Sequence, residues 1–275
     1  MGAKPEAAKS ESSRAGKSGG IRPDIATIGG LALALGGIVG GLMLEGGKLR
    51  DISQVTAAMI VLGGTLGAVM VTTPLRTLMG AAKRLKLVFF EQNQSAGEVI
   101  NEIIEYATKA RKSGIVALEQ DADAVADPFL RKALNLAVDG TDLQVLRKMM
   151  ELEIGLDEQH NEAEAKVFEA AGGYAPTIGI IGAVLGLIQV MKHLEDIKEV
   201  GAGIAVAFVA TVYGVGVANL FFLPAANKIK ARLHHTILLK ELMLEGVVGI
   251  VEGLNPKLIR VKLEAYVREH SKKAS

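Results

Sequence analysis

Two long stretches without a charged residue lie close together in the second half of the chain. The first covers residues 175–191 and the second residues 200–223, and only a short charged turn separates them. About 20 consecutive apolar residues are enough to cross a bilayer as a helix. The sequence therefore predicts two membrane-spanning helices joined by a tight turn.

Both predicted spans are rich in Gly and Ala rather than in Leu alone. Gly179 precedes Ala183 by four positions, and Gly182 precedes Gly186 by the same distance. Small residues at this spacing let helix backbones approach closely in lipid, where apolar burial supplies little drive for association. We therefore expect these spans to pack against other helices.

Two further apolar segments precede this hairpin. The run over residues 24–44 is longer than the apolar part of a signal peptide and lacks a clear cleavage site, so we expect a retained first helix. A second span is expected over about residues 55–73, after a polar turn. The first run repeats the close-packing pattern with Gly29, Gly30, Gly36, Gly37, Gly40 and Gly41.

Basic residues predict how the spans are oriented. Five Lys or Arg residues precede the first span, and others follow the second and the fourth spans. The short turns inside the two hairpins carry fewer, and acidic residues balance those in the turn at 192–199. Positive charge favours the cytoplasmic side, so both termini and the long segment between the second and third spans should be cytoplasmic.

The segment over residues 80–170 has helical patterns throughout. Ser95 and Glu98 form a capping box, and Gly114 is placed to end the helix that follows it. Asp127 and Pro128 open another helix, and a long one begins near residue 141 and is expected to run into the third span. A further amphipathic helix is expected after Pro224, to about residue 254, followed by a shorter one.

No strand pattern competes with these helical patterns, so the predicted class is all-α, with four transmembrane helices and a helical cytoplasmic domain. The expected parts are a disordered cytoplasmic tail over 1–23, the first two spans over 24–79, the cytoplasmic domain over 80–170, the last two spans over 171–224, and cytoplasmic C-terminal helices over 225–275.

Several classes of function find no support in the composition. The chain has no Cys, its five His residues have no obvious catalytic partners, and it lacks the glycine-rich phosphate-binding motifs. We therefore expect no enzyme activity, no cofactor and no metal site. The net charge of +1 gives no indication of nucleic-acid binding.

The predicted spans contain no carboxylate. An ion transporter normally places one at membrane depth, whereas the ionisable groups here are Tyr174 and Tyr213, whose ordinary pKa of about 10 makes them poor proton carriers. Either the protein conducts nothing, or another chain supplies the titrating group. The polar residues available to line a path are Thr177, Gln189, Thr211, Tyr213 and Asn219.

Thr211 lies deepest in the fourth span, although a Thr there also commonly bonds to the preceding helical turn. Pro176 and Pro224 bracket the hairpin near its cytoplasmic ends. A proline weakens one helical turn, so the pair suggests a hinge. The alternative is that Pro176 occupies a first turn and Pro224 ends a helix.

The sequences YAPTIGIIGAVLGLI, VAFVATVYG and FFLPAANKI resemble the third and fourth spans of the MotA/PomA family of flagellar motor stator subunits. ARKSGIVALE and DGTDLQVLRK resemble the cytoplasmic domain of that family. The resemblance covers the chain from about residue 24 onward. It implies a homopentamer in the bacterial inner membrane that surrounds two helices of a MotB or PomB partner, whose aspartate binds the ion. It also implies torque on the rotor protein FliG.

The resemblance also assigns roles to individual residues. Arg111 and Glu119 match the rotor-contact positions, although most exposed charges are merely solvated. Pro176 and Pro224 match the prolines that couple ion passage to movement, and Thr211 and Tyr213 match pore-lining positions. Sodium-driven relatives place Thr where this chain has Ala183, so the missing hydroxyl favours protons.

Two other readings remain open. The ExbB/TolQ class, which energises outer-membrane processes, also forms pentamers around partner helices but has three spans and differently placed loops. A non-conducting membrane scaffold is also compatible with uncharged spans. Four spans with the long loop between the second and the third favour the stator.

Overall fold

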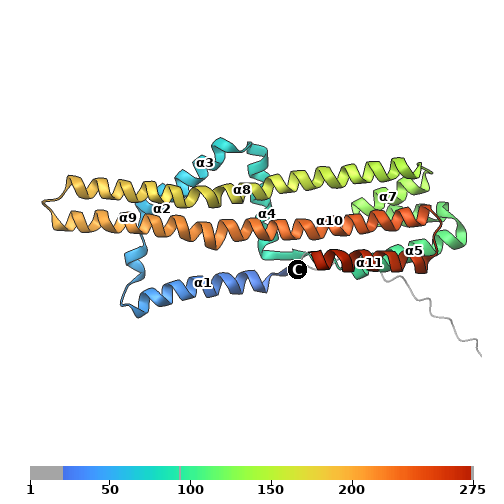
Figure 1. Cartoon of the computed structure of the whole chain (residues 1–275), viewed down its shortest axis with the longest axis horizontal. Coiled ribbons are helices and arrows are strands. Elements are labelled where there is room, and N and C mark those ends of the chain that lie inside the picture. Colours follow the sequence, from blue (N-terminus) through green and yellow to red (C-terminus); the bar gives the residue numbers. More distant parts are fainter. Residues whose placement is uncertain (1–20, 93, 274–275) are drawn as a thin grey trace, which may run out of the picture.

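The computed structural model describes residues 21–92 and 94–273, most of which are helical (Figure 1). Four helical segments are long and apolar enough to cross a membrane. The predicted all-α class with four spans is thereby confirmed. Two long rods dominate the shape and lie side by side over most of their length (Figure 1).

The first span is α1 (Ile25–Leu44), which begins where the Asp24 carboxylate accepts a hydrogen bond from Thr27 N at 3.0 Å. A short 3₁₀ turn, η1 (Leu49–Ile52), leads to the second span. That span comprises α2 (Val55–Ala58), the π turn η2 (Met59–Gly63) and α3 (Gly64–Thr72). It ends before Pro74, because a residue that precedes proline is disfavoured in helical conformation.

The helix α4 (Leu75–Phe89) follows at once and runs across the two rods (Figure 1). The strand β2 (Phe90–Gln92) then pairs antiparallel with β1 (Ile21–Pro23), with Arg22 opposite Glu91. The expectation of no strands was wrong here, because three-residue strands are too short to show a period of two. Residues 1–20, most of the tail expected to be disordered, lie outside the described residues.

The segment between the second and third spans continues with α5 (Ala96–Ser113), the 3₁₀ turn η3 (Ile115–Leu118), α6 (Glu119–Ala124) and α7 (Pro128–Val138). The predicted capping box is present, since Ser95 Oγ accepts from Glu98 N and Glu98 Oε2 accepts from Ser95 N. Gly114 ends α5 with a φ of +83° that other residues rarely adopt.

The first rod is α8 (Leu143–Lys192), a single helix that begins before the third span and runs through it, as predicted. The second rod comprises α9 (Ile197–Val217), the π turn η4 (Ala218–Phe222) and α10 (Leu223–Val251). The alternative that Pro224 ends a helix was wrong, because α10 continues directly from η4. The π turn directly before it changes the bonding register, which accommodates a residue without an N–H. The last helix is α11 (Pro256–Lys273).

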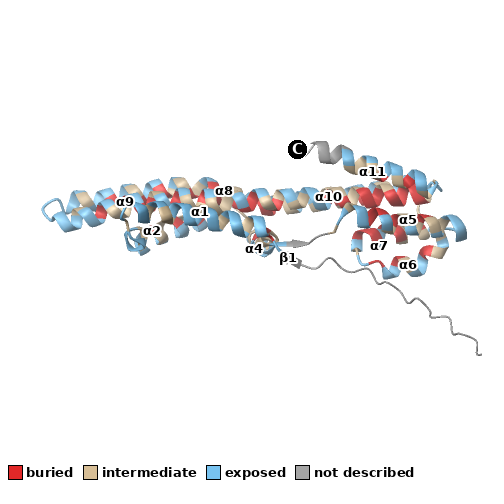
Figure 2. Cartoon of the chain, turned by 90° about the horizontal axis from the view of Figure 1, so that it is seen from below, coloured by how far each residue is buried: buried red, intermediate tan, exposed pale blue. Residues whose placement is uncertain are grey.

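Buried apolar residues form three clusters, of which the two larger ones lie outside the contact between α2 and α9 (Figure 2). The larger core joins α5, α7, the first part of α8, α10 and α11 through side chains such as Phe129, Met150, Leu242 and Leu263. A smaller core joins α3, α4, α8 and α10 at the junction with the spans, through Val69, Ala81, Phe168, Ala225 and Ile229. The rods therefore connect the spans to the larger core.

Candidate functional site

The third and fourth spans pack backbone to backbone. A β-carbon on Gly179 would lie 2.9 Å from Ala210 O, and one on Gly186 would lie 2.8 Å from Gly203 O. Such positions have no room for a side chain, so glycine sets the distance between α8 and α9. The prediction that these glycines mediate helix packing is confirmed, and their partner is the other arm of the same hairpin.

Pro176 lies inside α8, and Pro224 lies in the first turn of α10, next to the π turn. Pro176 has no N–H to donate to the carbonyl of Gly172, four residues earlier. Gly172 is buried against Leu223, the residue before Pro224. The two helical turns that the prolines weaken therefore face each other, and neither proline ends a rod.

The hydroxyls of Thr177 and Thr211 bond to their own helices. Thr177 Oγ1 donates to Tyr174 O at 2.8 Å, and Thr211 Oγ1 donates to Ala207 O at 3.2 Å. The local bond considered for Thr211 is therefore present. Each oxygen keeps lone pairs with which to accept a hydrogen bond. Ala183 is half-buried, one turn beyond Gly179.

Tyr213 faces the second span. Its hydroxyl donates to Ile52 O at 2.5 Å and accepts from Gln54 N at 3.3 Å. Its ring packs on the cluster that includes Ala57 and Val61. The structure therefore places Tyr213 where it ties α9 to the start of α2.

Large apolar faces of the spans are uncovered. On α9, Phe208 is 70% exposed, and it continues a stripe with Ile204, Val212 and Val215. The whole of α1 lacks a buried residue, and a β-carbon on any of its six glycines would meet nothing within 4 Å. Uncovered apolar surface of this extent needs lipid or other protein chains against it.

Among the described residues, the four spans contain no Asp, Glu, Lys, Arg or His, and no group of three metal-ligating side chains occurs. Charged clusters lie instead at the ends of the spans near the smaller core, where sequence reasoning did not find them. Glu164 on α8 is buried, 2.6 Å from Arg84 Nε and 3.3 Å from His160 Nε2. The buried hydroxyl of Thr65 on α3 was also missed, and it has no hydrogen-bond partner among the described residues.

The second cluster joins the beginning of the first span to the second rod. Lys228 Nζ lies 2.5 Å and Arg232 Nη2 2.6 Å from Asp24 Oδ2. The hydrogen bonds from Lys228, from Thr27 N–H and from Arg232 hold the pKa of Asp24 well below its ordinary range, although burial opposes them. Arg232 also donates to Phe90 O, so the same side chain binds the strand pair.

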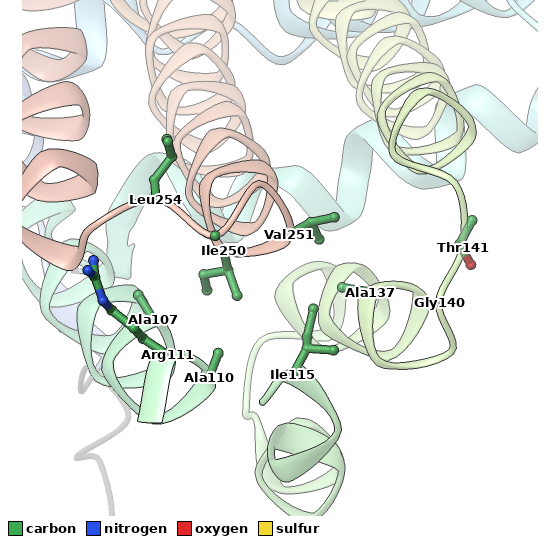
Figure 3. Close-up of a pocket in the computed structure, with 11 residues that line it drawn as sticks. Ala107, Ala110, Arg111, Ile115, Ala137, Gly140, Thr141, Ile250, Val251 and Leu254 are labelled. Carbon is green, nitrogen blue, oxygen red and sulfur yellow. The ribbon is translucent and has the colours of Figure 1, made fainter. Parts of the chain in front are cut away.

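The end of the larger core that is farthest from the spans presents Arg111 and Glu119. Arg111 is in the last turn of α5 and lines a cleft of about 380 Å³, with Ile250 and Leu254 on the opposite wall (Figure 3). Glu119 begins α6 and is exposed. Within the described part of the chain neither residue makes an ion pair, whereas Lys109 Nζ lies 2.6 Å from Asp121 Oδ2.

The comparisons with known proteins cover nearly the whole chain. Residues 28–114 match the motility protein A N-terminal family, and residues 121–242 match the MotA/TolQ/ExbB proton channel family. Motility protein A of Helicobacter pylori is 36% identical over 92% of this chain and 98% of its own length. Chemotaxis protein PomA of Vibrio alginolyticus is 32% identical over 90% of this chain and 96% of its own length.

Two solved structures have the same fold. The chain of the C. jejuni MotAB structure superposes with a TM-score of 0.84 at 33% identity, covering 88% of this chain and 95% of that chain. The flagellar MotAB stator complex of Bacillus subtilis gives a TM-score of 0.82 at 33% identity, covering 91% and 100%.

Proposed function

This chain belongs to the MotA/PomA family of flagellar stator subunits, and we propose that, with a MotB-like partner, it forms an ion conduit that converts ion flow into torque on the rotor. The observation that carries the proposal is the lack of an ionisable acid in the described spans of a protein built like a MotAB subunit. The acid that binds the ion must then come from the partner.

The uncovered faces support an assembly around that partner. A stripe of apolar side chains runs along α9 beside Thr211, and α1 offers six glycines with open space around them. In our proposal five copies form a ring around two partner helices, as in the family. The inner faces of α8 and α9 then surround the partner's carboxyl group, with Thr177, Ala183 and Thr211 along the path.

The ion is proposed to be a proton. A proton neutralises the partner's carboxylate, and a neutral carboxyl group is tolerated in apolar surroundings that disfavour the charged form. Sodium instead needs several oxygen ligands in place of its water. The side chain of Ala183 offers no oxygen at the position where sodium-driven relatives carry a hydroxyl.

Movement is proposed to arise where the prolines weaken the rods. A change of charge on the partner alters how α8 and α9 pack against it, and the turns at Pro176 and Pro224 yield most easily. Because α8 and α10 are continuous into the cytoplasmic core, this displacement reaches Arg111 and Glu119. There the unpaired charges are available to attract complementary charges on FliG.

The orientation follows from the basic residues. Those within α4 and α10, such as Lys83, Lys86 and Lys230, favour a cytoplasmic location for this side of the spans, with both termini on the same side of the bacterial inner membrane. The cytoplasmic location of the rotor-contact region depends on this assignment.

The ExbB/TolQ alternative is not favoured. The family that covers residues 121–242 includes those proteins, but residues 28–114 match the motility protein A N-terminal family. Four spans also exceed the three expected of that class.

Proton uptake by vesicles that contain this chain and a MotB-like partner tests the proposal. We expect a leak that requires the partner and disappears when the partner's aspartate is replaced by asparagine. Replacement of sodium by potassium should leave the leak unchanged. Absence of any proton leak from an unplugged complex would support a non-conducting scaffold instead. A selective leak through this chain alone would contradict the proposal that the partner supplies the ion-binding acid.

A further inference from the structure

The helix α4 has two contrasting faces. One face enters the smaller core through buried Ala81 and Val88, with Leu78 and Leu85 packed beside them. The other face is exposed and combines Leu75, 65% exposed, and Met79, 53% exposed, with three exposed cations, Arg76, Lys83 and Lys86.

The cations on this exposed face are not neutralised by the chain itself. Arg84, on the inner side of the helix, pairs with Glu164 at 2.6 Å. By contrast, no ion pair within the described residues includes Arg76, Lys83 or Lys86. The helix contains no acidic residue. Its outer face is thus purely cationic and apolar.

The position of α4 suits a membrane surface. It begins at Leu75, directly after the second span ends at Thr72, on the side that the basic residues assign to the cytoplasm. Its axis runs across the two rods (Figure 1), whose apolar parts in α8 and α9 are long enough to cross a membrane. A helix transverse to the spans at their end lies along the plane of the bilayer surface.

We propose that the exposed face of α4 binds the anionic phospholipid headgroups of the cytoplasmic leaflet. Leu75 and Met79 enter the boundary of the acyl chains, while the long stems of Lys83 and Lys86 carry their charges up to the phosphates. A protein surface would have to desolvate three unpaired cations and match them with acids, whereas the headgroup layer is both wet and anionic.

The natural absence of Cys allows a direct test. The full complex with a cysteine-free partner carries Met79→Cys, labelled with a fluorophore, and is placed in phosphatidylcholine nanodiscs. A minority of the lipid bears a nitroxide on its acyl chain and has either a phosphatidylglycerol or a phosphatidylcholine headgroup. The ratio of quenching by these two lipids at equal mole fraction measures headgroup enrichment beside α4.

We expect the nitroxide phosphatidylglycerol to quench more strongly, with an enrichment on the order of fivefold that falls as salt is raised. The variant Arg76→Gln/Lys83→Gln/Lys86→Gln should bring the ratio to about one. The matched control Lys148→Gln/Lys257→Gln/Arg268→Gln removes three exposed cations from α8 and α11, away from α4, and should leave the ratio unchanged.

Four results would overturn the proposal. Equal quenching by both lipids would mean apolar contact without headgroup recognition, and quenching by aqueous iodide alone would mean a solvated face. Protection from lipid and from iodide would mean that a second copy covers α4. An equal loss in the control variant would mean a general charge effect. None of these readouts depends on proton flow or torque, so failure here is distinct from failure of the proposed function.

Discussion

Gly172 of α8 and Leu223 of α10 are in contact with no space between them for a methyl group, since a β-carbon at residue 172 would lie 2.6 Å from Leu223 Cδ2. The Gly172 carbonyl is the one that Pro176 leaves without its helical donor, and Leu223 directly precedes Pro224. This contact therefore joins the weakened turns of the two rods. A shift of one rod against the other at this level would change this contact.

Gly172→Ala should disturb this junction. We expect the added methyl group to separate α8 from α10 at a cost of roughly 1–3 kcal/mol, as for other overpacked positions, and to reduce swimming while the protein still reaches the membrane. Swim-plate diameter and the amount of membrane-bound protein are the measurements. Gly173→Ala is the matched control, because a β-carbon there meets nothing within 4 Å. Equal swimming of the two variants would contradict the role of the contact.

Asp24→Asn should loosen the attachment of the first span to α10. The substitution leaves Lys228 and Arg232 without their shared carboxylate, and loss of one partner from a buried ion pair costs on the order of 3 kcal/mol. The thermal unfolding midpoint of the purified complex should fall. Asp123→Asn removes an exposed carboxylate and should leave the midpoint unchanged.

The same carboxylate predicts a dependence on pH. Its pKa in the folded protein lies below the ordinary value of about 4, so its stabilisation is complete above that value and is lost as the pH falls below it. Stability measured from pH 8 to pH 5 should show no loss from this group. Below about pH 4 the natural chain should lose stability more steeply than the Asp24→Asn variant. Parallel curves at acidic pH would refute the assignment.

Local signals in the sequence predicted most of the fold. The capping box at Ser95 and Glu98, the positive φ at Gly114 and the apolar runs each depend on neighbouring residues, and each is present. The strand pair, the π turns and the Asp24 cluster were not predicted. Asp24 and Arg232 are 208 positions apart, so no periodicity or motif relates them.

In the candidate site, too, some features were predicted from the sequence and others are visible only in the structure. Pro176 and Pro224 were identified in the sequence, but the contact of Gly172 with Leu223 between them depends on how the rods are aligned. Arg111 and Glu119 came from the family resemblance. Only the structure shows that these two charges are unpaired within the described chain, whereas the neighbouring Lys109 pairs with Asp121.

Tyr213→Phe should weaken the link between α9 and the second span. The substitution removes the hydroxyl that donates to Ile52 O and accepts from Gln54 N, which should cost about 0.6–1.5 kcal/mol. Hydrogen exchange of residues 49–55 in the purified complex should become faster. Tyr174→Phe is the control, because the Tyr174 hydroxyl makes no hydrogen bond among the described residues. Unchanged exchange in Tyr213→Phe would show that the link is dispensable.

Charge reversals at the end of α5 and the start of α6 should distinguish charges that bind an outside partner from charges that pair within the subunit. Arg111→Glu and Glu119→Lys should each reduce swimming without lowering the thermal stability of the complex, because neither side chain is paired within the described chain. The combination should not restore swimming, since the expected partners lie on the rotor. Unimpaired swimming of both single variants and of the double variant would reject the rotor contact.

Lys109 and Asp121 provide the internal comparison, because their charges pair with each other across α5 and α6. Lys109→Glu alone should cost up to about 1 kcal/mol, the usual worth of a partly exposed pair, and addition of Asp121→Lys should restore stability and swimming together. If swimming recovers in the double variant at 109 and 121 but not in the one at 111 and 119, the first pair stabilises the fold of the subunit. The second pair then binds an outside partner. Recovery by both exchanges would place all four charges within the subunit and leave the rotor to be contacted elsewhere.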